Sequence, residues 1–110
     1  MRVHSALGPG LLESAYQVCL AHELDAAGMS IEVHAPLPVS YRGVYLDAGY
    51  RLDIVVDRRL LLELKAVAKL HPIHEAQLLS YLKLSGIPVG LLMNFHVPLL
   101  RDGIKRMVLG

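Results

Sequence analysis

The segment RLDIVVDRRLLLELK, residues 51–65, is the part of the sequence that most constrains the fold. Two apolar runs flank a charged stretch, which is typical of a β-hairpin. Side chains alternate between the two faces of a strand, so the apolar faces coincide only if the turn holds an odd number of residues. A three-residue turn at 57–59 pairs Val56 with Leu60, Ile54 with Leu62 and Leu52 with Leu64.

The same register places Asp53 directly opposite Glu63. Like charges in that position destabilise a sheet, so something must offset the repulsion. One interpretation is an ionic cluster with Lys65 and Arg51 on a solvated face of the sheet. The other is a divalent cation such as Mg²⁺, which proteins hold with one or two carboxylates. Spacing alone favours the ionic cluster, because Asp-x9-Glu-x-Lys is a loose pattern.

The remaining elements are expected on both sides of this hairpin. The Gly-Pro-Gly at 8–10 breaks the chain after a short helix or entry segment at 2–7. Helical spacing predicts a helix over 11–27 that Gly28 ends, and Pro72 and Gly86 bracket a second helix over 72–85. The predicted strands are 31–41, which Pro36 and Pro38 confine to an edge or to bulges, then 44–56, 60–65, 88–95 and 104–109. This order predicts an α/β or α+β sheet with helices packed on it.

Composition limits the classes of protein to consider. The chain has 110 residues, of which 54% are hydrophobic, so we expect a single domain over 1–110. A net charge of +1 is no signal for nucleic acid, and no basic stripe interleaved with aromatic residues is found. Cys19 is the only cysteine, which excludes a disulfide within the chain. No signal peptide or membrane-length apolar run is present, so we expect a cytoplasmic protein without a membrane partner.

Four sequence blocks carry a resemblance to a known family. Gly10-Leu-Leu-Glu13-Ser-Ala-Tyr16 is similar to the motif that names the GxxExxY proteins, which are assigned to the PD-(D/E)XK nuclease superfamily. LGPGLLESAY, RLDIVV, LLELKAV and HEAQLLSYLK resemble that family's blocks in order, over about residues 4–109. The resemblance implies a restriction-endonuclease-like α/β fold, with a central mixed sheet of four to five strands flanked by helices.

Two departures from the family pattern are visible. Leu52 stands where the superfamily name has proline, a common variation that leaves the Asp53 ligand in place. Similar proteins also carry more helix before the position of Met1. If the native chain begins upstream, part of the packing of the first helix lies outside this sequence.

The resemblance also implies a metal site. Asp53 and Glu63 would bind Mg²⁺ or Mn²⁺, and the backbone carbonyl of Leu64 would add a ligand. The metal would lower the pKa of a bound water and stabilise charge on the attacked phosphate. Lys65 would orient or help deprotonate that water, or neutralise the transition state. The alternative for Lys65 is a salt bridge to one of the two carboxylates.

Five further residues are candidates for the site, of which Glu13 and Gln77 have their roles by resemblance. Glu13 would reach the metal or its bound water, although an acid in a first helical turn is favourable by itself. Gln77 would bond metal-bound water or phosphate, or it is a surface amide. Tyr16 is expected to fill the edge of the core and aim its hydroxyl at a carboxylate. His74 would contact phosphate or cap its helix, and Tyr81 is expected to pack with a polar tip.

Other chemistries fit the sequence poorly. His71 and His74 lack a third ligand at a recognisable spacing for zinc. Ser14 and Ser80 have no glycine elbow or evident base. Cys19 is expected to be buried and inert.

The sequence therefore predicts a metal-dependent nuclease acting on DNA or RNA. The alternatives are a catalytically inactive nuclease-like binding or regulatory module, and a structural dimer without a nucleic-acid partner. A domain this small offers little surface to duplex DNA, so a homodimer through a sheet edge is a further hypothesis.

Overall fold

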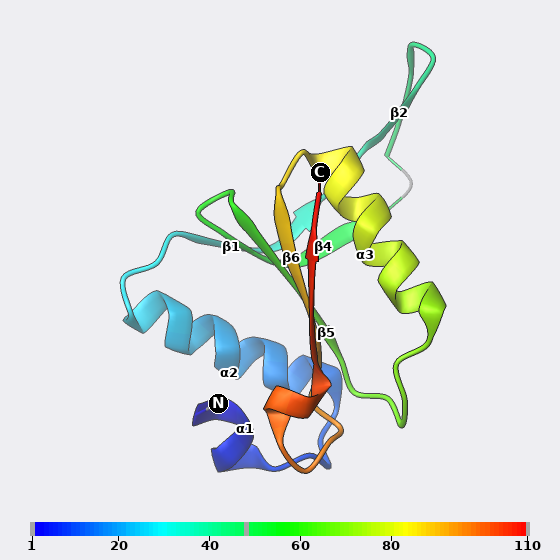
Figure 1. The fold of residues 1–110 in the computed structure, drawn as a ribbon. Helices are drawn as coiled ribbons and strands as arrows, with labels where there is room; N and C mark the ends of the chain where they lie inside the picture. Colours follow the sequence, from blue (N-terminus) through cyan, green and yellow to red (C-terminus); the bar gives the residue numbers. More distant parts are fainter. Residues whose placement is uncertain (1, 48, 110) are drawn as a thin grey trace.

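The computed structural model describes residues 2–47 and 49–109 (Figure 1). In chain order the elements are α1 (Arg2–Leu7), α2 (Glu13–Ala26), β1 (Ile31–Pro36), β2 (Val39–Tyr41), β3 (Val44–Leu46), β4 (Arg51–Val56), β5 (Leu60–Lys65), α3 (Pro72–Ser85), β6 (Val89–Asn94), the 3-10 helix η1 (Leu100–Gly103) and β7 (Ile104–Val108).

Five strands form one mixed sheet in the order β1-β4-β5-β6-β7. The neighbours are antiparallel except β5 and β6, which run parallel and are joined through α3. Helices α1 and α2 lie on one side of the sheet and α3 lies on the other (Figure 1). This arrangement confirms the predicted α/β class with a restriction-endonuclease-like mixed sheet flanked by helices.

Both faces of the central strands are covered, which explains why β4 and β5 read as nearly continuous apolar runs. The core on the α2 side contains Tyr16, Ile54, Val56, Leu62, Leu64 and Phe95. The core on the α3 side contains Leu52, Val55, Leu61, Leu78, Leu82 and Leu92. Helix α3 approaches β6 closely at Gly90, where a Cβ atom would lie 2.8 Å from the Leu78 side chain. The sheet therefore has no solvated face over its central strands.

Most of the predicted elements are confirmed, including the short helix at the start and the last edge strand. Helix α3 begins with Pro72 at its first turn and ends at Gly86, which has a φ of 76°. Strand β1, which contains Pro36, lies at the edge of the sheet as predicted. The 3-10 helix η1 was not predicted.

Two predicted strands are wrong in length. The strand expected over 31–41 is divided into β1 and β2, and the strand expected over 44–56 is divided into β3 and β4. β2 and β3 pair only with each other and project from the body as a small arm (Figure 1). The break between β1 and β2 falls at residues 37–38, where Pro38 has no N–H to donate to a sheet, and the Leu37 N–H makes the last contact, to the Tyr50 carbonyl at 3.0 Å.

The predicted hairpin register is right near the turn and wrong beyond it. Val56 pairs with Leu60 and Ile54 with Leu62, but the pairing of β4 with β5 ends there. Leu52 was expected on the same face as Ile54, yet it packs in the α3-side core while Ile54 packs in the α2-side core. The two strands therefore part at Asp53.

No helix within residues 2–47 and 49–109 is both long enough and apolar enough to cross a membrane.

Candidate active site

Asp53 lies where β4 separates from β5. Its Oδ2 accepts a hydrogen bond from the Leu64 backbone N–H at 2.8 Å. The Asp53 side chain thus takes the place of the backbone pairing between β4 and β5, which ends at Ile54 and Leu62. Asp53 is half-buried. Asp53 was expected directly opposite Glu63 in the ladder. Instead, its side chain contacts Leu64, the residue after Glu63.

Glu63 is buried, with 6% of its surface exposed. Burial raises the pKa of its carboxyl group to about 10, and the hydrogen bond to Asp53 and the charge of Asp53 act in the same direction. The charge of Lys65 opposes the shift only in part. Glu63 Oε1 has no hydrogen-bond partner among the described residues, although a buried oxygen normally has one.

These groups fit a hard divalent cation. Mg²⁺ binds oxygen ligands and keeps several waters, so two carboxylates and a carbonyl are a sufficient protein contribution. The N–H and C=O of a strand residue face the same side, so the Leu64 carbonyl faces β4 as its N–H does. Within residues 2–47 and 49–109, no three His, Cys, Asp or Glu side chains are grouped to hold a metal, so Glu13 does not count as a third side-chain ligand beside Asp53 and Glu63.

The first turn of α2 brings Glu13 to the same place. Burial raises the pKa of Glu13, the charge of Asp53 raises it further, and Lys65 lowers it. Glu13 therefore lies within electrostatic reach of both residues. Its side chain is half-buried, whereas the neighbouring Leu12 and Ser14 are exposed.

Tyr16 holds the loop from which α2 begins. Its ring is fully buried and stacks on Phe95 with 4.4 Å between ring centroids. Its hydroxyl donates to the Gly8 carbonyl at 2.5 Å and accepts from the Leu11 N–H at 2.9 Å. The prediction that this hydroxyl points at a carboxylate is wrong, because the loop folds back over the ring and offers two backbone groups first. Tyr16 fixes the loop that places Glu13.

Lys65 faces α3 rather than an acidic partner. Its Nζ donates to Gln77 Oε1 at 3.4 Å, and Gln77 Nε2 donates to the Tyr81 hydroxyl at 3.1 Å. Among the ion pairs of the described residues, none within 4.0 Å includes Lys65, Asp53 or Glu63. Lys65, Gln77 and Tyr81 thus form one polar row beside the carboxylates.

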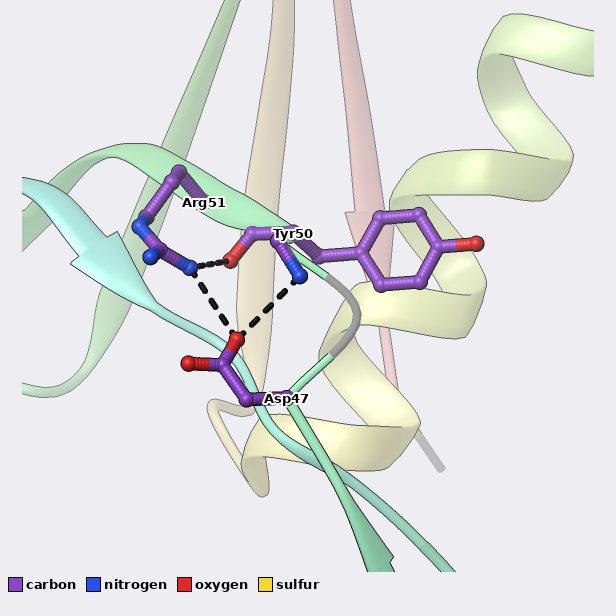
Figure 2. Close-up of polar contacts among 4 residues, drawn as sticks. Asp47, Tyr50 and Arg51 are labelled. Carbon is purple, nitrogen blue, oxygen red and sulfur yellow. Dashed lines mark hydrogen bonds and ion pairs between the residues drawn. The ribbon is translucent and has the colours of Figure 1, made fainter.

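The ionic cluster that spacing favoured is not formed. Arg51 pairs with Asp47 at 3.4 Å, at the base of the arm, and Glu63 is buried rather than on a solvated face (Figure 2). The reason is that α3 covers the face of the sheet that was expected to be open.

His74 and Cys19 also have clear positions. The His71 N–H donates to His74 Nδ1 at 3.0 Å, so His74 caps the start of α3. His74 also lines a cavity of about 650 Å³ together with Lys65, Gln77 and Tyr81. Cys19 is half-buried, not fully buried, because it packs at the margin of the α2-side core.

Two buried polar residues near the site were not predicted. Gln17 donates from Nε2 to the Asp53 carbonyl at 3.3 Å and contacts His34 Nε2 at 2.7 Å. It lies one helical turn after Glu13, and this spacing was a usable signal. Asn94 makes hydrogen bonds to both backbone groups of Val67 and so ties the loop after Lys65 to the end of β6. Nothing in the sequence indicates that long-range pairing.

The central hairpin of the mixed sheet thus carries the buried Glu63 beside the half-buried Asp53, with Lys65 two residues further along. A family model described as the PD-(D/E)XK nuclease superfamily matches residues 1–107. The chain belongs to the PD-(D/E)XK nuclease superfamily. Neither curated proteins nor solved structures give a match. Membership suggests nuclease activity on a nucleic-acid substrate, and nucleases of this superfamily generally depend on a divalent metal.

The raised pKa of Glu63 predicts a pH-dependent stability without metal. The folded chain keeps a proton that the unfolded chain loses above pH 4.5, so in EDTA the free energy of unfolding falls as the pH rises from 4.5 to about 10. For one proton the slope approaches about 1.4 kcal/mol per pH unit. Urea denaturation across this range measures it.

Glu63→Gln should flatten that slope because the amide does not ionise. Glu32→Gln is the matched control, since Glu32 is exposed and pairs with Arg58 at 2.7 Å. A wild-type stability that does not change over this pH range would contradict the burial of Glu63.

The contacts of Tyr16 predict that its hydroxyl stabilises the loop before α2. In Tyr16→Phe the Gly8 carbonyl and the Leu11 N–H both lose their partner, and we expect a loss of about 1–3 kcal/mol in the free energy of unfolding. Tyr45→Phe, at a tyrosine that is 72% exposed, should change it little. Equal stability of the two variants would show that the hydroxyl of Tyr16 is not held in this way.

Proposed function

We propose that this protein is a metal-dependent nuclease that hydrolyses phosphodiester bonds of nucleic acid with Mg²⁺ or Mn²⁺. The observation that carries the proposal is the buried Glu63 Oε1, which lacks a partner beside Asp53. Asp53, Glu63 and the Leu64 carbonyl are the proposed metal ligands. A buried carboxyl group with an unsatisfied oxygen beside a second carboxylate destabilises the fold. A bound cation would offset the repulsion between the two carboxylates and give the unsatisfied oxygen a partner.

The side chains around the ligands supply the remaining chemistry. A divalent cation held there would stabilise charge on the attacked phosphate and make a water more acidic. Lys65 has no ion pair to break, so its ammonium group is available to orient the attacking water or to neutralise the phosphate. Gln77 holds Lys65 in place, and Glu13 completes the polar cluster from α2. Tyr16, His74 and Tyr81 support these residues.

The same proposal includes the subfamily, the extent of the domain, the oligomeric state and the location of the protein. We assign the chain to the GxxExxY proteins on the motif from Gly10 to Tyr16, whose tyrosine fixes the loop that presents Glu13. A single domain over 1–110, a homodimer and a cytoplasmic location are proposals that accompany it.

The decisive experiment is cleavage of labelled DNA and RNA in Mn²⁺, with EDTA as the metal-free control. Lys65→Ala should lower the rate by about 10²–10³-fold, because it removes a positive charge aimed at the transition state. Lys69→Ala removes the same charge from an exposed position a few residues further along the chain and should leave the rate unchanged.

The other outcomes separate the alternatives. Equal cleavage by wild type and both lysine variants would point to a contaminating nuclease and contradict the proposal. Metal binding that Asp53→Asn abolishes, without cleavage by the wild type, would favour a nuclease-like binding or regulatory module. A folded protein that binds neither metal nor nucleic acid would favour a structural role.

A further inference from the structure

The cavity of about 650 Å³ beside Lys65 is larger than the metal site needs. Its wall is largely aromatic and aliphatic, with Tyr50 and Tyr81 next to Val39, Ile73 and Leu84. Ile73 is 69% exposed and Leu84 is 43% exposed, so this apolar surface faces solvent. An apolar wall with a few polar groups is the usual composition of a ligand site.

Tyr50 is fixed through its backbone and leaves its ring free to contact a ligand. Its carbonyl accepts hydrogen bonds from the Leu37 N–H at 3.0 Å and from Arg51 Nη1 at 2.8 Å. The same Arg51 nitrogen reaches Asp47 Oδ1 at 3.4 Å, and Asp47 Oδ1 also accepts from the Gly49 N–H at 3.1 Å. Figure 2 shows the Tyr50 ring pointing away from these contacts toward α3. Tyr50 as a whole is 45% exposed.

Tyr81 supports this ring from α3 and links it to the proposed catalytic row. The Tyr50 and Tyr81 ring centroids lie 6.0 Å apart with an angle of 58° between the planes, which is an edge-to-face contact. The contact leaves no room for a flat group between the rings, so such a group must stack on the solvent side of Tyr50. The Tyr81 hydroxyl accepts from Gln77, which in turn accepts from Lys65.

The charges around the cavity favour an anionic ligand. None of the described residues that line it is Asp or Glu, and Lys65 contributes a positive charge. A nucleotide has this combination, with a flat base at one end and an anionic phosphate at the other. Bases of a duplex are stacked on each other and paired, so only an unpaired base can stack on Tyr50.

The geometry points to a site for one unpaired nucleobase of single-stranded nucleic acid, stacked on Tyr50 with its phosphate toward Lys65. This inference rests on the proposed nuclease function and specifies its substrate class. The sequence has no stripe of aromatic and basic residues that would indicate this site. Tyr50, Lys65 and Tyr81 come from separate parts of the chain, and only the fold brings them together.

The test is binding of a fluorescein-labelled oligonucleotide of mixed sequence, single-stranded or annealed to its complement, followed by fluorescence anisotropy. Ca²⁺ replaces Mn²⁺ in this assay. It neutralises the carboxylates as Mn²⁺ would, but it takes a looser coordination geometry than the octahedral one of the smaller ion. Tyr50→Leu should weaken single-strand binding by about 5- to 150-fold, the range found when one base–aromatic stack is removed.

Two variants are the controls. Tyr50→Phe keeps the ring and should bind the single strand like the wild type. Tyr45→Leu removes a more exposed tyrosine of the arm that does not line the cavity, and should also bind like the wild type. Duplex affinity should be the same for all four proteins, and circular dichroism checks that each is folded.

Several results would overturn the inference. They are unchanged single-strand affinity in Tyr50→Leu, an equal loss in Tyr45→Leu, an equal loss of duplex affinity, or no single-strand binding by the wild type. A wild-type dimer that Tyr50→Leu dissociates, without single-strand binding, would assign the cavity to a second copy of the chain.

Cleavage in Mn²⁺ separates this inference from the proposed function. If wild type and Tyr50→Leu cleave duplex substrate equally well and their single-strand affinities do not differ, the nuclease stands and the base site is rejected. If single-strand binding depends on Tyr50 but no metal-dependent cleavage is found, the base site stands and the nuclease is rejected.

Discussion

The rest of the candidate site depends on one unfavourable contact, the buried Glu63 carboxyl beside Asp53. Helices cover both faces of the sheet, so water does not solvate this pair as it would on an open face. Asp53 accepts from the Leu64 N–H, whereas Glu63 Oε1 has no partner among the described residues. At neutral pH the raised pKa of Glu63 means that a proton occupies the pair in the absence of a cation. Under the proposed function, a proton and a divalent cation would compete for the same two carboxylates.

The parts of the fold that follow from local patterns could be predicted. The turn at 57–59, the register near it and the limits of α3 depend on alternation, proline and glycine, which act over a few residues. The register failed at Asp53 because a carboxylate took the Leu64 N–H, and alternation carries no information about such a substitution. The long strands failed because their apolar pattern continues through the arm of β2 and β3, and the pairing of these two strands in a sheet of their own is a tertiary property.

In the site, too, features that depend on local spacing could be predicted, whereas features that depend on tertiary contacts could not. Asp53, Glu63 and Lys65 lie on one hairpin, so their proximity follows from sequence spacing, and the family blocks indicated Glu13 and Gln77. Tyr16 was assigned the wrong partner because the path of the loop at 8–11 is a tertiary property. The contact between Tyr50 and Tyr81 joins the base of the arm to α3, and no periodicity predicts it. The proposed metal ligands are thus local in sequence, whereas the surface that would recognise a substrate is assembled by the fold.

The most direct test of this account is the number of protons released when Mn²⁺ binds at neutral pH. Isothermal titration calorimetry in buffers of different ionisation enthalpy measures that number. Competition between metal and proton at the Glu63 carboxyl predicts release of about one proton, which Glu63→Gln should abolish. Binding without proton release, or release that persists in Glu63→Gln, would contradict the account, as would no binding at all.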